Sequence, residues 1–367
     1  MHTTAASFLE QVGGNETARI IAAPMAGGPS TPHLVHSVTQ AGALGFLASG
    51  NISAAQLVAN MQQLRELSQG TPGHYGVNFF CRQEQEVSAH TIAALAPVLA
   101  DAYAHAHSTC TDDDDTEYVV PTPRALDYSN EFDDKFAAVL DARAQGYGPR
   151  IVSSSFGSFT PSEIAQLHEV GIYAWVSVTS PQEARQAQEN GADALIVQGK
   201  EAGGHQLTWS MTAEPAFMPV AELLPAVAEI TNATIPLIAA GGVRNACDVA
   251  RLCAFNAVQA VSCGSVFLLA TEAGTSADNR ALLEKGGETI LSRAFSGRYA
   301  RGLATTFSRS QLQLPPSYPY LSVMLKPLRS HPDFSYCLVG EDVHSLAAQD
   351  AAGIVAELSQ GLAQLSF

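Results

Sequence analysis

The sequence is poor in basic residues: 19 Lys and Arg stand against 35 Asp and Glu in 367 residues, a formal net charge of −16. Nucleic acids and anionic membrane surfaces attract basic proteins, so this balance argues against both as partners. The chain also lacks an apolar run near the roughly 18 residues that would suggest a membrane span. Its first ten residues lack the basic and then apolar pattern of a secretory signal, and we therefore expect a cytoplasmic protein.

Cysteine is also scarce and is not arranged for metal binding. None of the six cysteines forms a Cys-x-x-Cys pair, which favours reduced thiols; they are residues 81, 110, 247, 253, 263 and 337. His105, His107 and Cys110 precede the acidic run Asp112–Asp115. This mixture suits no common metal site, so we expect no metal and interpret residues 108–130 as an exposed acidic insertion.

Short β-rich runs alternate with helical stretches between residues 20 and 271, and 46% of the chain is hydrophobic, which is enough for a sizeable core. The predicted strands are Ile20–Pro24, Leu44–Ala48, Gly76–Phe80, Ile151–Ser154, Tyr173–Val178, Ala194–Gln198, Pro236–Ala240 and Val258–Cys263. Helical stretches such as Pro181–Asn190 and Asn245–Phe255 follow them. Eight strand–helix units over about 250 residues favour an α/β fold of the (β/α)8 TIM-barrel type. A doubly wound open sheet is the alternative, although eight strands is a large number for one.

This pattern assigns residues 1–275 to the barrel and residues 276–367 to a C-terminal extension. The extension contains Ser296–Gly302 and Pro315–Pro319 before a helical end. We expect it to pack on the barrel mouth or in an oligomer interface, which leaves room for a homo-oligomer.

One segment combines a glycine pair with an imidazole where a parallel strand ends. The residues from Gln198 to His205 follow the apolar run Ala194–Val197. Ligands bind at the carboxyl ends of parallel strands. Gly203 and Gly204 let the backbone approach a ligand closely, and His205 has a pKa suited to moving protons near neutrality.

Two further strand ends predict a phosphate cradle. Gly241 and Gly242 end the seventh predicted strand, and Gly264 and Ser265 follow the eighth, where we expect a helix to open. Backbone N–H groups at these two strand ends commonly bind phosphate in such barrels. For the glycine pair alone, a tight turn is the simpler interpretation.

The remaining candidates suit a flat ring. Pro24, Met25 and Ala26 end the first strand and provide an apolar seat, while Asn78 and Gln198 offer amides that bond both donors and acceptors. Together with a phosphate cradle they suit flavin mononucleotide (FMN). A turn role for Asn78 and an internally satisfied amide for Gln198 are the alternatives.

Five segments in the same order along the chain carry a resemblance to a known family. They are Ala23–Gly28 with Ser30–Pro32, Asn78–Phe80, Val152–Gly157, Gln198–His205 and Ala239–Val243. The ordered set, and Glu-Ala-Gly-Gly-His above all, resembles the nitronate monooxygenases, formerly called 2-nitropropane dioxygenases. The resemblance implies a flavin-bearing barrel without metal that oxidises alkyl nitronates or nitroalkanes with dioxygen to carbonyl compounds and nitrite.

By this resemblance His205 matches the catalytic histidine, either as a neutral base or as an imidazolium that holds the nitronate. The flavin-contacting positions matched are Pro24, Met25, Ala26, Asn78, Gln198, Gly203, Gly241, Gly242, Gly264 and Ser265. Gln206 and Leu207 stand where the family often has Arg-Gly, which leaves the substrate side open. Glu201 is expected to orient its loop or cap a helix, and Tyr299 and Tyr318 are candidates to close the pocket or simply to pack.

Two other functions remain open at this point. A flavin-dependent enoyl-acyl carrier protein reductase of the barrel type has a similar Glu-Ala-Gly-Gly-His-like motif and takes hydride from a nicotinamide cofactor. Its acidic carrier protein favours a basic surface, which fits a chain of net charge −16 less well. A flavin-binding protein without turnover is the third reading.

Overall fold

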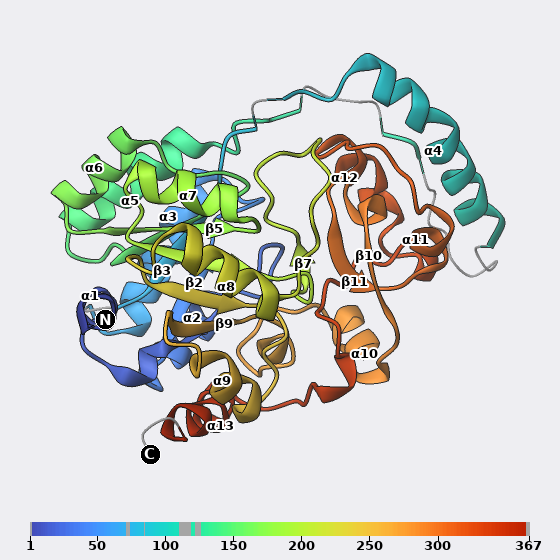
Figure 1. Cartoon of the computed structure of the whole chain (residues 1–367). Helices are drawn as coiled ribbons and strands as arrows, with labels where there is room; N and C mark the ends of the chain where they lie inside the picture. Colours follow the sequence, from blue (N-terminus) through green and yellow to red (C-terminus); the bar gives the residue numbers. More distant parts are fainter. Residues whose placement is uncertain (1, 71–73, 84, 110–118, 122–125, 365–367) are drawn as a thin grey trace.

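The computed structural model describes residues 2–70, 74–83, 85–109, 119–121 and 126–364. Eight parallel strands close into a barrel in the order β1-β2-β3-β4-β5-β6-β8-β9 (Figure 1). They are β1 Ile20–Ala22, β2 Leu44–Ala48, β3 Gly76–Phe80, β4 Ile151–Ser155, β5 Tyr173–Val178, β6 Ala194–Gln198, β8 Leu237–Ala240 and β9 Val258–Cys263. All eight predicted strands are present, and the predicted (β/α)8 barrel is confirmed.

Three predicted strand ends are wrong by one or two residues: β4 ends at Ser155 instead of Ser154, and proline explains the other two. The first strand stops at Ala22 instead of Pro24, and β8 starts at Leu237 instead of Pro236. Proline has no N–H to donate to a sheet ladder, so strands tend to end or begin beside it. The helix predicted over Asn245–Phe255 covers Ala246–Cys253. It starts one residue later because Asn245 is its N-cap and accepts a hydrogen bond from the backbone of Asp248.

Alternation along the strands directs polar side chains into the barrel. Leu195 and Val197 belong to the core between strands and helices, whereas Ile196 lies in the cluster inside the barrel. Successive side chains of a strand point to opposite faces. Gln198, two residues after Ile196, therefore points inward at the carboxyl end of β6, and the same alternation turns Asn78 inward.

The N-terminal helix α1 (His2–Gln11) closes the opposite end of the barrel. The Phe8 ring stacks on Trp175 with centroids 5.7 Å apart, and Trp175 Nε1 donates to Gln11 Oε1 at 2.7 Å. Arg150, just before β4, donates to the carbonyls of Glu10 and Gln11. These contacts fill the amino-terminal end, so that the carboxyl ends of the strands remain for a site.

In the part of the chain that the structure describes, eight helices surround the barrel, and the last comes from the far end of the chain. They are α2 Pro32–Gln40, α3 Ala54–Leu67, α5 Phe132–Ala144, α6 Pro161–Glu169, α7 Pro181–Asn190, α8 Val220–Ile230, α9 Ala246–Cys253 and α13 Ala351–Ala363. After β9 the predicted helix is only a three-residue 3-10 turn, Ser265–Phe267. Helix α13 packs on both α9 and α2 and covers the barrel there instead (Figure 1).

The segment between β9 and α13 builds a lobe beside the barrel mouth (Figure 1). It contains α10 (Ala277–Lys285), α11 (Thr306–Ser310) and α12 (Tyr320–Leu325). Strands β10 (Thr289–Ser292) and β11 (Ala300–Leu303) pair with the short strand β7 (Gly204–His205) in the antiparallel order β10-β11-β7. The strand that carries His205 thus belongs to the sheet of the lobe.

Helix α4 (Ala89–Thr109) extends along the outside of the lobe and shares an apolar core with α12, in which Leu95 and Leu99 join Leu321 and Leu325. Its His105 Nε2 lies 2.8 Å from a carboxylate oxygen of Asp333. Cys110 and the acidic run 112–115 of the predicted insertion lie outside the described residues.

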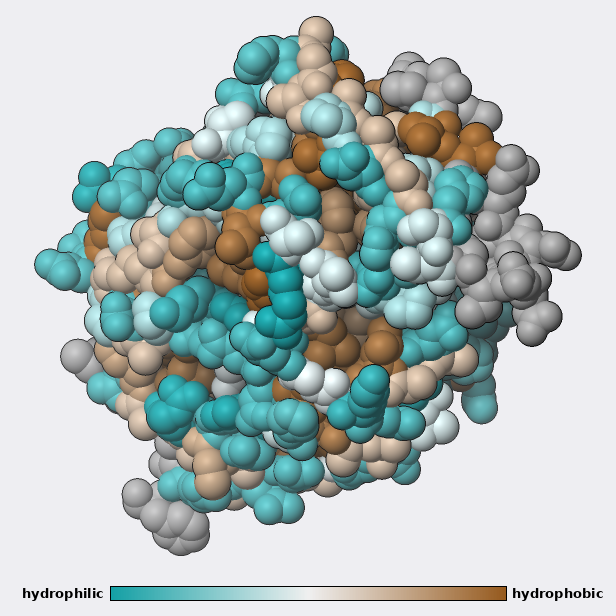
Figure 2. Space-filling view, turned by 90° about the vertical axis from the view of Figure 1, so that its right-hand side faces the viewer, coloured by the Kyte–Doolittle hydropathy of each residue, from teal (hydrophilic) through white to brown (hydrophobic). Residues whose placement is uncertain are grey.

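Within the described ranges no helix is long and apolar enough to cross a membrane. Figure 2 shows the lobe side of the molecule, where hydrophilic residues cover most of the surface and hydrophobic ones form small separate areas. In the described chain the large hydrophobic side chains that are exposed are Val119, Val120, Leu312 and Val323.

Candidate active site

A cavity of about 790 Å³ lies at the carboxyl ends of the strands and extends to the lobe. Its walls include all eleven predicted site residues, namely Pro24, Met25, Ala26, Asn78, Gln198, Gly203, His205, Gly241, Gly242, Gly264 and Ser265. Small-molecule and cofactor sites usually measure about 300–1,000 Å³. The structure therefore brings the whole predicted set around one cavity that is large enough for a mononucleotide and a small substrate.

Unpaired backbone donors mark one end of this cavity, which we call the glycine end: Gly241 and Gly242 after β8, and Gly264 and Ser265 after β9. The backbone N–H groups of these four residues donate to no atom in the described part of the chain. Gly241 and Gly242 have positive φ angles of 106° and 68°, which favour glycine. The turn after β9 is too short to provide a helix dipole. At the glycine end an anion would therefore be bound by these N–H groups themselves.

Gly203 has a steric role in addition to its place in the cavity wall. A Cβ atom there would lie 2.4 Å from Gly340 N and 2.5 Å from Val339 C. Glycine is therefore required because the tail of the chain crosses close over this loop. Gly340 N also donates to Ser265 Oγ at 2.9 Å, which ties the tail to the glycine end.

The two amides are largely satisfied inside the protein. Asn78 Nδ2 donates to Ser153 Oγ at 3.0 Å and to Ser155 Oγ at 3.1 Å. Gln198 Nε2 donates to the carbonyl of His205 at 3.0 Å, and Gln198 Oε1 accepts from Leu207 N at 2.9 Å. An amide nitrogen carries two hydrogens and its oxygen two lone pairs, so Gln198 keeps one donor and one acceptor for a ligand.

His205 lies at the other end of the cavity, in an aromatic enclosure. The His205 ring meets Phe156 edge-on, with centroids 5.8 Å apart, and Tyr318 at 5.8 Å. Its Nε2 lies 2.7 Å from the hydroxyl oxygen of the buried Ser296, while Nδ1 has no partner among the described residues. Phe156 has a φ of 66°, a strained value for a bulky residue and one that clusters at functional sites. We call this region the histidine end.

Burial and two positive charges hold the His205 imidazole neutral. Burial of the ring lowers its pKa to about 3, and the Arg298 and Arg329 guanidinium groups act in the same direction. The neutral form of histidine is the one that accepts a proton. Of the two roles left open by the sequence, this environment favours the base over the imidazolium.

Arg298 is a residue that sequence reasoning passed over, although it lies in the Ser296–Gly302 segment. Its guanidinium carbon lies 4.2 Å from the centroid of the Phe156 ring, and its Nη2 donates to Gln83 Oε1 at 2.7 Å. Nη1 donates to the carbonyl of Thr208. These contacts link three loops. Arg298 is only 1% exposed, so it lies behind the cavity wall.

Three minor expectations have different outcomes. Glu201 caps a helix as expected, because its carboxylate accepts from Val220 N, the first residue of α8, at 3.1 and 3.2 Å. Tyr318 lines the cavity. Tyr299 does not: its ring packs on Phe217, and its hydroxyl donates to Glu214 at 3.0 Å, away from the site.

Comparisons with known proteins agree with this geometry. The sequence profile of the nitronate monooxygenase family matches residues 12–352. A nitronate monooxygenase of Paraburkholderia phytofirmans is 33% identical over 295 residues, which cover 79% of this chain and 74% of that protein. A nitronate monooxygenase of Pseudomonas aeruginosa is 29% identical over 321 residues, or 85% of each chain.

Solved structures extend the comparison to the fold. The nitroalkane oxidase from Streptomyces ansochromogenes superposes with a TM-score of 0.83 at 30% identity and covers 98% of both chains. FabK from Thermotoga maritima superposes with a TM-score of 0.68 at 22% identity, over 97% of this chain and 96% of that one, which is a likeness of fold alone. From the profile match over nearly the whole chain, together with these relatives, the chain belongs to the nitronate monooxygenase family of oxidoreductases.

Proposed function

We propose that this protein binds FMN in the cavity and oxidises alkyl nitronates and nitroalkanes with dioxygen to carbonyl compounds and nitrite. The observation that carries the proposal is that a neutral, partly enclosed imidazole and a set of unpaired backbone N–H groups line the same cavity. Membership of the nitronate monooxygenase family supports the same chemistry.

The residues present fit FMN. The unpaired N–H groups of Gly241, Gly242, Gly264 and Ser265 suit a phosphate, which accepts several hydrogen bonds. The wall formed by Pro24, Met25 and Ala26 would seat the flat ring, and the spare donor and acceptor of Gln198 would meet its polar edge. When bound, FMN supplies the electron acceptor for the substrate and the electron donor for dioxygen.

His205 would act on neutral nitroalkanes. The hydrogen on the carbon next to a nitro group is acidic because the resulting anion is delocalised onto oxygen. Nδ1 of His205, which has no partner in the described chain, would accept this proton while Ser296 holds Nε2. A nitronate that arrives already deprotonated needs no base, so His205 matters most for the neutral substrate.

An anaerobic flavin spectrum of the purified protein tests the proposal. A nitronate is added to one cuvette and a reduced nicotinamide cofactor to another. Bleaching of the oxidised flavin band by nitronate alone, with recovery in air, is the expected result.

The other outcomes separate the alternatives. Bleaching by the nicotinamide cofactor alone would indicate the enoyl-acyl carrier protein reductase, and a bound flavin that responds to neither would indicate a binding role. Absence of flavin that added FMN does not restore would overturn the cofactor assignment.

A further inference from the structure

Two arginines influence His205, and they differ in what their guanidinium groups can still bind. Arg298 uses both terminal nitrogens for protein carbonyl and amide oxygens and does not line the cavity. Arg329, which follows α12 in the lobe, does line it. Of these two arginines, Arg329 is therefore the one placed to meet a ligand.

The Arg329 side chain is held in place on one side and free on the other. Its guanidinium carbon lies 3.9 Å from the centroid of the Tyr336 ring, and Nη2 donates to Ser322 Oγ at 2.9 Å. Within the described ranges Nη1 donates to nothing, the buried Nε also has no partner, and no carboxylate forms a salt bridge with this residue. A cation fixed by stacking, with free donors and no counter-charge, is a ready partner for an anion.

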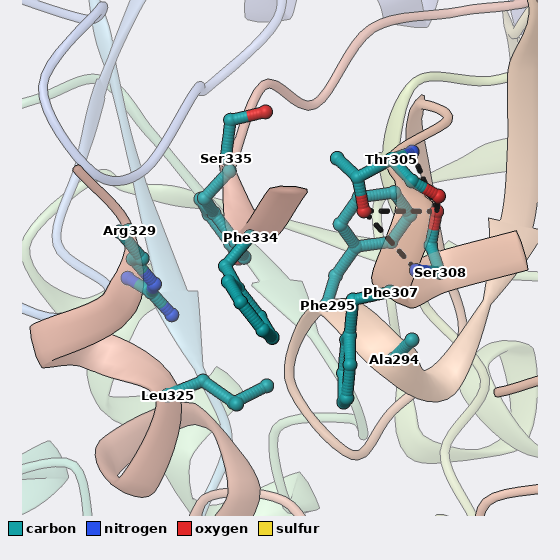
Figure 3. Close-up of a pocket in the computed structure, with 10 residues that line it drawn as sticks. Ala294, Phe295, Thr305, Phe307, Ser308, Leu325, Arg329, Phe334 and Ser335 are labelled. Atoms are coloured by element: carbon teal, nitrogen blue, oxygen red, sulfur yellow. Dashed lines mark hydrogen bonds between the residues drawn. The ribbon is translucent and has the colours of Figure 1, made fainter. Parts of the chain in front are cut away.

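Arg329 also lines a second, much smaller pocket inside the lobe (Figure 3). That pocket measures about 10 Å³ and is lined by Leu325, Phe334 and other lobe residues. It has room for about one water molecule at most. A ligand of Arg329 must therefore approach from the large cavity, on the side of His205.

The chemistry of the proposed substrate matches a guanidinium group. A nitro group is planar with two oxygens, and loss of the neighbouring proton moves an electron pair onto them. The resulting nitronate has the shape and charge of a carboxylate, which guanidinium groups bind through two parallel N–H donors.

We propose that Arg329 binds the two nitro oxygens of the substrate while His205 removes the proton from the adjacent carbon. The proposal rests on the proposed function above. The C–H bond breaks, the proton goes to the imidazole, and the electron pair is delocalised onto the oxygens held by Arg329. Because charge grows on these oxygens during the step, the interaction strengthens toward the transition state.

The surroundings of His205 support this division of roles. The groups that face the ring are the Ser296 hydroxyl, the Phe156 and Tyr318 rings, and the charges of Arg298 and Arg329. Burial raises the pKa of Tyr318, which keeps that phenol neutral. The net positive field keeps the imidazole unprotonated and ready to accept a proton before the reaction. The same field makes the imidazole a weaker base, so the stabilisation of the new anion by Arg329 is the effect that promotes the transfer.

The test compares R329M and R329K with the wild type and with R309M. Arg309 is a matched control, because it lies in the same lobe and pairs with Glu288 on the surface, away from the cavity. Propionate serves as an unreactive mimic of the nitronate of nitroethane, and its Kd is measured by NMR titration. Turnover of nitroethane and of its preformed nitronate is measured across pH.

In R329M we expect the Kd of propionate to rise by about tenfold or more, as for loss of a charge-assisted pair. We expect kcat/KM for nitroethane to fall about 10²–10³-fold, with its acid limb shifted to higher pH. R329K keeps the positive charge, so the acid limb of its kcat/KM profile should stay near the wild-type position. It should bind propionate more weakly than the wild type. R309M should match the wild type.

If R329M and R309M have the same propionate Kd and the same kcat/KM for nitroethane, the role of Arg329 is overturned, while the proposed function is not affected. If R329M fails to fold, wild-type propionate affinity in R329K overturns the two-donor contact. A wild-type protein that does not oxidise the nitronate would overturn the proposed function, and the propionate titration would still report separately on anion binding by Arg329.

Discussion

The glycine end and the histidine end of the cavity are built in different ways. At the glycine end the donors are backbone N–H groups of Gly241, Gly242, Gly264 and Ser265, which directly follow two neighbouring barrel strands. At the histidine end the groups are side chains, and they come from the loop after β4, from β7 and from the lobe. The first end follows from strand order, whereas the second exists only when the lobe docks on the barrel.

The largest effect should come from H205N, which removes the base and leaves the glycine end intact. We expect kcat/KM for nitroethane to fall about 10²–10⁴-fold, the usual contribution of a general base. Flavin content should not change, and turnover of the preformed nitronate should fall much less. Steady-state assays with both substrates measure this, and wild-type turnover of nitroethane by H205N would contradict the assignment.

G203A should damage both ends at once, because Gly203 lies where the tail crosses the loop that leads to His205. Its Cβ would press on Gly340 N at 2.4 Å, and such overpacking typically costs about 1–3 kcal/mol. We expect a lower urea midpoint and a loss of bound flavin.

G264A is the matched control for stability, since its Cβ would meet its nearest atoms at ordinary distances of 3.7–3.9 Å. Urea unfolding and flavin absorbance of both variants give the comparison. Equal stability of G203A and G264A would mean that the tail yields easily and that the two ends are less tightly joined than the structure indicates.

The pH dependence of turnover should distinguish the two ends of the cavity, because the His205 imidazole titrates and the backbone N–H groups of the glycine end do not. A neutral imidazole is the active form, and a pKa lowered to about 3 keeps His205 neutral as the pH falls from 7. The acid limb of kcat/KM for nitroethane should therefore lie well below pH 6.5. In R298M the loss of a nearby positive charge should raise the pKa of His205 and move the limb upward. An acid limb near 6.5 in the wild type would refute this account.

The smallest effect should come from E201Q, because this residue follows β6 and only caps the first turn of α8. Its carboxylate accepts from Val220 N, and a negative charge near a helix N-terminus stabilises by about 0.3–1 kcal/mol. Glutamine keeps the shape and an acceptor oxygen, so we expect a loss of less than about 1 kcal/mol in urea unfolding. Loss of nitronate turnover without loss of stability would instead assign Glu201 to the chemistry.

Much of the barrel was predictable, because its signals are local. Each strand is a short apolar run, and the site residues on the barrel stand at or near the carboxyl end of such a run, so residues as distant as Pro24 and Ser265 were assigned to one rim. The errors at Pro24 and Pro236 come from extending apolar runs across prolines that cannot donate to the ladder. The missing helix after β9 was not predictable in the same way, since α13 covers that position from nearly 90 residues away along the chain.

The sequence by itself determined the eight-strand barrel, the edge of the barrel at which the cavity lies and the glycine end, because these depend on strand periodicity and on backbone groups next to each strand. Only the tertiary structure decided the histidine end. Pairing of β7 with β11 orients His205, burial and the Arg298 and Arg329 charges keep it neutral, and lobe packing leaves Arg329 with free donors at the cavity. Such properties depend on residues that are far apart in the chain, and no local pattern encodes them; His205 and Arg329, for example, are 124 positions apart.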